Sequence, residues 1–143
     1  MDAKTSPLTP LNDPSLLKTD ALIGGAWAPG ASRFDVHDPA TGQRLADVAN
    51  LDAADAEAAI AAAQKAWPAW RAKAAKERAA VLMKWFALLH QHADDLARIM
   101  TAEQGKPLAE AKGEVAYGAS FLEWFAEEAK RVYGETIPTT DGN

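Results

Sequence analysis

Cysteine is absent from this 143-residue chain, so disulfides, thiolate metal ligands and thiol nucleophiles cannot form within it. The chain also lacks any run of about 18 uncharged apolar residues, which a membrane-spanning helix requires. Residues 1–20 hold no apolar signal-peptide core, and their prolines predict an irregular N-terminal arm. We therefore predict a cytoplasmic protein with no membrane segment, whose ordered part begins near residue 21.

Signals for nucleic acid, nucleotide and metal binding are equally scarce. The net charge is −5, with 20 acidic and 15 basic residues, and no basic stripe marks a nucleic-acid surface. No Gly-x-Gly-x-x-Gly fingerprint occurs, so no cofactor-binding residue is predicted in the chain. His90 and His92 are two residues apart and would diverge on a helix, so they do not suggest a metal site.

The segment 21–50 has the composition of short strands joined by turns. It holds four of the nine glycines, and residues 34–38 alternate apolar and polar side chains as a half-buried strand does. Asp38-Pro39-Ala40-Thr41-Gly42 predicts a turn, since proline presets φ and glycine tolerates positive φ. We expect a small β-meander here, with residues 44–49 as the return strand.

From residue 52 onward the pattern is helical. Asp52 is a good N-cap, and Pro68 is expected to end or kink the first helix. A second helix from about Lys76 carries an apolar stripe that predicts one continuous buried face, with a bend near residues 90–95. Gly105 is expected just past its end, and Pro107 at the first position of the next helix. The stripe consists of Leu82, Trp85, Leu89, Ala93, Leu96 and Met100.

The last helix is predicted over residues 107–133 and carries two apolar stripes. The first alternates steps of three and four residues. The second consists of Tyr117, Phe121 and Trp124 and lies about 100° around the helix. Two adjacent stripes require contact on two sides, so the second is either further core or the wall of a ligand cavity. The first consists of Leu108, Ala111, Val115, Gly118, Leu122, Phe125, Ala129 and Val132.

Several motifs, taken in order over residues 22–138, resemble the N-terminal part of the aldehyde dehydrogenase superfamily. The quoted segments are Leu22-Ile23-Gly24-Gly25-Ala26-Trp27, Asp38-Pro39-Ala40-Thr41-Gly42, Trp67-Pro68-Ala69-Trp70-Arg71, Lys76-Glu77-Arg78 and Glu103-Gln104-Gly105-Lys106-Pro107. Two further segments resemble the succinate-semialdehyde dehydrogenases within that superfamily. These are Phe121-Leu122-Glu123-Trp124-Phe125-Ala126-Glu127-Glu128 and Tyr133-Gly134-Glu135-Thr136-Ile137-Pro138.

The resemblance implies an α/β fold with a dinucleotide-binding domain, of which this chain is a mostly α-helical part. Residues 1–20 are then an arm, and residues 21–143 an incomplete family domain. The family attacks aldehydes with a cysteine thiolate and passes hydride to NAD or NADP. Those catalytic and cofactor groups lie beyond Asn143 in the family, so no catalytic residue is assigned here and no cofactor is expected to bind the chain alone.

The resemblance also suggests particular roles for a few residues. The last helix is similar to the one lining the family's substrate tunnel, which makes Tyr117, Phe121 and Trp124 tunnel candidates. Some members hold a monovalent cation near the position of Glu103 and the backbone around residues 36–37, so Glu103 is a possible metal ligand. The family is homo-oligomeric, and its substrate is a small aldehyde.

Three hypotheses follow. The first is the N-terminal portion of an NAD(P)-dependent succinate-semialdehyde dehydrogenase of 4-aminobutyrate degradation, inactive by itself. The second is a non-catalytic helical fragment that associates with partner subunits or with itself through uncovered apolar surface. The third is a small helical bundle whose motifs match by coincidence. The sequence chooses neither between NAD and NADP nor between oligomeric states.

Overall fold

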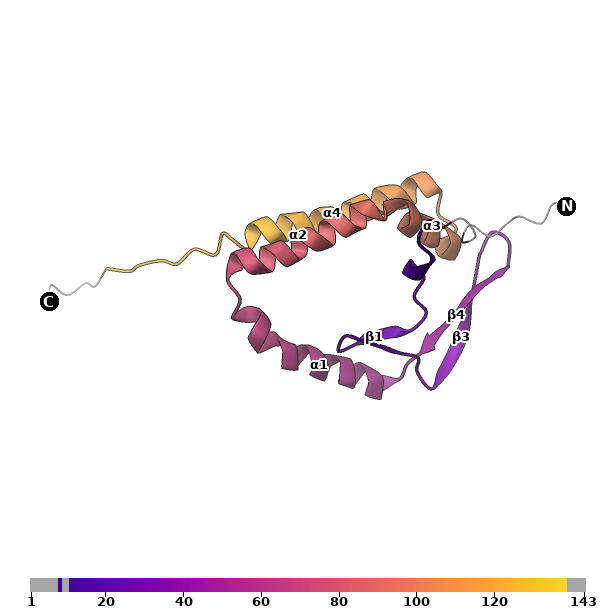
Figure 1. Ribbon diagram of the computed structural model, residues 1–143, viewed down its shortest axis with the longest axis horizontal. Coiled ribbons are helices and arrows are strands. Elements are labelled where there is room, and N and C mark those ends of the chain that lie inside the picture. Colours follow the sequence, from indigo (N-terminus) through magenta and orange to yellow (C-terminus); the bar gives the residue numbers. More distant parts are fainter. Residues whose placement is uncertain (1–7, 9–10, 139–143) are drawn as a thin grey trace.

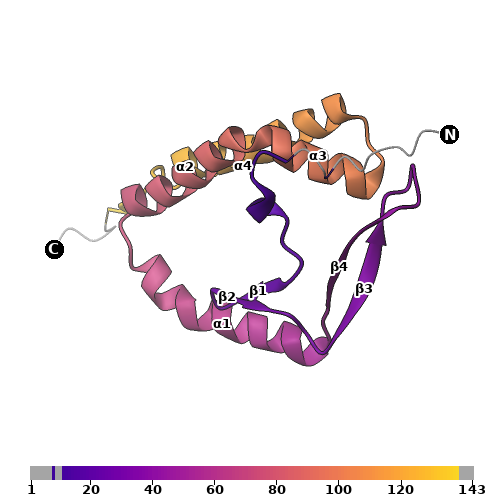
Figure 2. The same cartoon turned by 45° about the vertical axis from the view of Figure 1, so that its right-hand side comes forward.

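The computed structural model describes Leu8 and residues 11–138 as an open ring of helices and short strands. Helices α2, α3 and α4 lie together on one side, while α1 and the strands form the other side (Figures 1 and 2). The elements in chain order are η1 (Pro14–Leu16), β1 (Ala21–Ile23), β2 (Ala26–Ala28), β3 (Ser32–His37), β4 (Arg44–Asn50), α1 (Ala53–Arg71), α2 (Ala75–Gln91), α3 (Ala93–Gln104) and α4 (Leu108–Glu128). The prediction of a mostly helical chain with short N-terminal strands is confirmed.

The strands form two separate antiparallel hairpins, β1–β2 and β3–β4, rather than one continuous meander. Gly24 and Gly25 connect β1 to β2 with φ of 59° and 86°, which a two-residue hairpin turn requires. Pro29 and Gly30, the latter at φ 72°, lie between β2 and β3. Proline offers no N–H for a strand ladder, which fits the break in pairing here.

Helix α1 begins as predicted but continues through its proline. The Asp52 carboxylate accepts from the N–H groups of Ala54 and Asp55 at 2.8 and 3.1 Å, and the Asp55 side chain accepts from the N–H of Asp52. This reciprocal capping satisfies N–H groups that have no partner inside the helix. Pro68 lies inside α1, which ends three residues later at Arg71. Of the two predicted alternatives, a helix end at Pro68 is wrong, and a kink stays a prediction.

The predicted second helix is two helices, with a break at His92. His92 has φ −104° and ψ 15°, and its N–H is bonded to the carbonyl of Leu88 at 3.0 Å. Gly105 ends α3 with φ 72°, as predicted for a left-handed C-terminal residue. Pro107 is the N-cap of α4 rather than its first residue as predicted, so the helix begins one residue later, at Leu108. It ends at Glu128 instead of residue 133.

Small residues form the buried core, and the described part of the chain contains no large side chain that is fully buried. Helices α2 and α3 pack against α4, with partly buried Leu96, Met100 and Leu108 around the centre. The predicted continuous buried stripe is wrong at Trp85, which is 56% exposed. The buried apolar residues are Ala79, Ala97, Ala102, Ala111, Val115, Ala119 and Ala126. Among the described residues, no helix is long and apolar enough to cross a membrane.

The predicted turn at residues 38–42 docks on the junction between α3 and α4. The buried Asp38 carboxylate accepts from the Ala40 N–H at 2.8 Å and from the Thr41 hydroxyl at 3.0 Å. Pro39 then lies so close to Gly105 that a Cβ on Gly105 would meet the Pro39 Cγ at 3.0 Å. This contact fixes the tip of the β3–β4 hairpin against the helices.

Gly105→Ala is expected to lower the free energy of unfolding by about 1–2 kcal/mol, since a left-handed backbone is costly for an L-residue. The added methyl group also crowds Pro39. Urea unfolding followed by circular dichroism measures the change. Gly113→Ala is the matched control, since its Cβ meets nothing within 4 Å inside α4 and alanine favours helix by up to about 1 kcal/mol. Equal stabilities of the two variants would contradict this account of Gly105.

Candidate functional site

An aromatic groove runs along the exposed face of α4. It has a volume of about 640 Å³, and its walls come from α4 and the residue Arg131 just beyond it. The groove is lined by Tyr117, Ser120, Phe121, Glu123, Trp124, Phe125, Glu127, Glu128 and Arg131. The three tunnel candidates are therefore brought together on one surface.

Spacing on the helix explains why these rings meet. Tyr117, Phe121 and Trp124 are separated by four and three residues, so they lie on one side of α4. The Tyr117 and Phe121 rings contact edge to face, with centroids 4.9 Å apart at 78°, a favoured aromatic geometry. The three side chains are 67%, 45% and 63% exposed, respectively. They are therefore not core within this chain, although their role as a ligand wall stays a prediction.

Two ion pairs lie at the end of the groove nearest the C-terminus of α4. Lys130 Nζ lies 2.8 Å from Glu127 Oε2, and Arg131 lies 2.8 Å from Glu128. The hydrogen bond from Lys130 lowers the pKa of Glu127 below its ordinary value, and the positive charge of Lys130 is the second cause in the same direction. Glu127 therefore stays ionised near neutral pH and does not provide a general acid there.

The chemistry available in the groove is binding. Among the described residues that line it, Ser120 and Tyr117 carry the hydroxyl groups, and the Ser120 hydroxyl donates to the Tyr117 carbonyl at 2.7 Å. No histidine lines the groove to activate that serine. With one helix as its wall, the groove offers an apolar aromatic surface on which a substrate or a second protein surface can rest.

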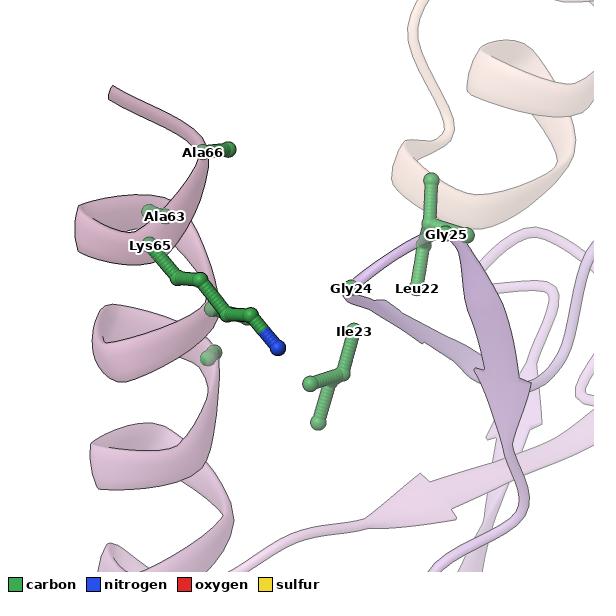
Figure 3. Close-up of a pocket in the computed structure, with 9 residues that line it drawn as sticks. Leu22, Ile23, Gly24, Gly25, Ala63, Lys65 and Ala66 are labelled. Atoms are coloured by element: carbon green, nitrogen blue, oxygen red, sulfur yellow. The ribbon is translucent and has the colours of Figure 1, made fainter. Parts of the chain in front are cut away.

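A second hollow, of about 780 Å³, is lined by residues of the β1–β2 hairpin and of α1. Figure 3 shows Lys65 of α1 extending toward Ile23, with the turn at Gly24 and Gly25 above. This hollow is not among the features predicted from the sequence. Its signal is a row of alanines on the α1 face toward the hairpin, which leaves room for a neighbour. The alanines that line it are Ala59, Ala62, Ala63 and Ala66.

Glu103 is exposed at the end of α3 and borders a third, smaller groove between the helices. The Pro39–Gly105 contact brings the β3–β4 hairpin next to this end of α3. Across Leu8 and residues 11–138, no three His, Cys, Asp or Glu side chains are grouped to hold a metal ion. The cation role of Glu103 stays a prediction that rests on the resemblance.

Comparison with known proteins identifies the class. The model of the aldehyde dehydrogenase family matches residues 27–143, which is most of the chain. The chain therefore belongs to the aldehyde dehydrogenase family. It forms the mostly helical N-terminal part of that family's dinucleotide-binding fold.

Within the family, the chain is similar to semialdehyde dehydrogenases. It is 58% identical over 130 residues to the succinate-semialdehyde dehydrogenase GabD of Escherichia coli, named for NADP(+), covering 90% of this chain and 27% of that protein. It is 56% identical to 3-sulfolactaldehyde dehydrogenase of Pseudomonas putida, with the same coverage. The crystal structure of succinate-semialdehyde dehydrogenase from Burkholderia pseudomallei matches with a TM-score of 0.88 and 58% identity, covering 94% of this chain and 28% of that one.

The chain thus spans about a quarter of the length of the relatives it matches. The shared quarter includes the aromatic groove, both hairpins and all four α-helices. It holds no cysteine, the residue type that the family resemblance requires as nucleophile. The groove can therefore contribute to a family active site only together with other residues.

Proposed function

We propose that this chain is the N-terminal portion of an NAD(P)-dependent succinate-semialdehyde dehydrogenase, acting in the cytoplasm in 4-aminobutyrate degradation. The observation that carries the proposal is identity of 54–58% to named semialdehyde dehydrogenases across 87–90% of the chain. The aromatic face of α4 would form one wall of the aldehyde site. The nucleophile, the oxyanion donors and the nicotinamide site would come from residues outside this chain.

The relatives support a chemical class of substrate more strongly than one compound. Their named substrates include succinate semialdehyde, glutarate semialdehyde and 3-sulfolactaldehyde. Each of these is a short aldehyde with an acidic group at its far end, a carboxylate or a sulfonate. Identities of 56–58% do not rank the three. We propose an acidic short-chain aldehyde as the class and succinate semialdehyde as its first member.

The isolated chain is expected to show no turnover with succinate semialdehyde and either NAD⁺ or NADP⁺. The physical reason is that it has no cysteine thiolate to form the thiohemiacetal from which hydride leaves. The assay follows the absorbance of the reduced nicotinamide over hours at high protein concentration. Sustained NAD(P)H formation by the pure chain would contradict the proposal that the nucleophile and the nicotinamide site come from residues outside it.

The alternative, a non-catalytic fragment that binds partner subunits, is favoured by the large amount of apolar surface. Fifteen large hydrophobic side chains of the described residues are exposed, and four of them, Tyr117, Phe121, Trp124 and Phe125, lie together in the aromatic groove, as at a protein interaction site. Mixing the chain with GabD that lacks its matching segment separates the two proposals. Recovery of activity supports the enzymatic role, whereas binding to intact GabD subunits without any recovery supports the alternative.

A further inference from the structure

The stretch from Asn12 to Asp20 crosses between the two sides of the ring. Figures 1 and 2 both show it leaving the α3 region, passing through η1 and reaching β1. We call residues 12–20 the strap. Its two ends are held by different charged residues, one on the helices and one on the hairpins.

The Asp95 carboxylate holds the strap on the helical side. Its Oδ1 accepts from the Asn12 N–H at 2.9 Å and from the Asn12 side-chain amide at 3.1 Å, and its Oδ2 accepts from the Asp13 N–H at 2.8 Å. Asp95 is only 2% exposed and lies in the first turn of α3. Each oxygen of a buried carboxylate thus has a partner from the strap, and the helix dipole favours its charge.

Arg33 holds the other end of the strap on β3–β4. Its guanidinium donates to the Asp20 carboxylate at 2.7 Å and to the Thr19 carbonyl at 3.3 Å. The same guanidinium donates to the Asp47 carboxylate at 3.0 Å, which ties it to β4. The Thr19 carbonyl also accepts from the Ala49 N–H at 2.8 Å. The strap is thus bonded to helix α3 at one end and to a hairpin at the other.

We propose that the strap fixes the hairpins on the helical unit, that Asp95 is its fastening on that unit, and that neutralising Asp95 releases it. The strap is a conformational device of the chain, and its release does not depend on enzymatic activity. Asp13 begins η1 by accepting from the Ser15 N–H at 3.0 Å, so the strap leaves its fastening in a defined direction. Links that would persist after release include the Pro39–Gly105 contact and the connection between α1 and α2.

The charges around Asp95 set the sign of its pH dependence. The hydrogen bond from the Asn12 N–H is the main cause that lowers the pKa of Asp95, and Arg98 lowers it further. A lowered folded pKa stabilises the native contact above the unfolded pKa of about 3.9, and this stabilisation is lost as the pH falls through the folded value. The titratable groups facing this region are Asp13, His92, Asp94, Arg98 and Lys112, the last paired with Asp94 at 2.7 Å.

Asp95→Asn tests the fastening, because it keeps the shape, removes the charge and turns one acceptor into a donor that faces the strap's N–H groups. Hydrogen exchange of residues 12–17 is expected to accelerate by about tenfold or more, since a bond to a charged group is lost. Asp94→Asn, one residue away and exposed, is the matched control and should leave these rates within about twofold. Unchanged exchange of the strap in folded Asp95→Asn overturns the proposal.

If Asp95→Asn does not fold, a pH titration of the unsubstituted chain tests whether the Asp95 carboxylate holds the strap. The amide proton shifts of Asn12 and Asp13, followed by NMR between about pH 6 and pH 2, should move together along the titration curve of the Asp95 carboxyl carbon. The exchange rates of the strap should rise over the same interval before the helices unfold. Amide shifts that are independent of Asp95, or a strap that is lost only on global unfolding, overturn the proposal.

Discussion

Trp124→Ala is expected to raise the KM for succinate semialdehyde by about tenfold in a chimera that carries this chain in place of the matching 130 residues of GabD. Trp124 lines the aromatic groove and is 63% exposed in the chain, so its ring is available as a wall. Loss of a contact made equally to substrate and transition state changes KM more than kcat. Steady-state kinetics with varied aldehyde measures both constants.

Trp67→Ala is the matched control for this prediction. Trp67 is 55% exposed on α1 and lies outside the residues that line the groove. Its removal deletes the same amount of aromatic surface but should leave KM within about twofold. Equal KM values for the Trp124 variant and the unsubstituted chimera, with both folded, would contradict the proposal that this face of α4 forms a wall of the aldehyde site.

The isolated chain is expected to self-associate and to bind an apolar dye through α4. Trp124 and Phe125 are 63% and 57% exposed, and removing their apolar area from water favours association. Replacing both with lysine should weaken association by about tenfold or more and reduce dye fluorescence. Sedimentation over a range of concentrations and fluorescence titration measure the two effects.

Ile137→Lys serves as the control for the association experiment. Ile137 is 88% exposed beyond the end of α4, so this change adds one positive charge, half that of the double replacement, without altering a residue that lines the groove. Association that falls equally in the control shows a general effect of charge. A chain that stays monomeric and binds no dye before any substitution contradicts the expectation of an uncovered interaction face.

Local features of the fold could be predicted because each depends on a few neighbouring residues. The Asp52 cap, the left-handed Gly105 and the turn at residues 38–42 follow from side-chain hydrogen bonding and backbone sterics. The break at His92 was anticipated only as a bend. No proline or glycine marks it, so its position depends on how α2 and α3 each pack on α4.

Burial was the least predictable property. Trp85 lies on a stripe with helical spacing, yet it is 56% exposed, because periodicity marks the face that needs a neighbour and does not supply one. The same limit applies to Tyr117, Phe121 and Trp124, whose spacing favoured core over ligand wall without excluding the wall. Their exposure in a chain that spans a quarter of its relatives agrees with surface that other residues would cover.

The strap could not be predicted at all. Asn12 and Asp95 are 83 residues apart in sequence, and no local pattern connects them. In the sequence, Asp94 and Asp95 are two adjacent acids of the kind common in the first turn of a helix. Only the three-dimensional arrangement distinguishes them, with Asp95 buried under the strap and Asp94 paired with Lys112 at the surface.

The most direct test of the enzymatic account is the kcat/KM of the unsubstituted chimera for succinate semialdehyde with NADP⁺, measured beside GabD itself. If this chain is the N-terminal portion of such an enzyme, the chimera should reach within about tenfold of GabD and prefer succinate semialdehyde to an uncharged aldehyde of equal length. A folded chimera that binds NADP⁺ but oxidises neither aldehyde would contradict the account.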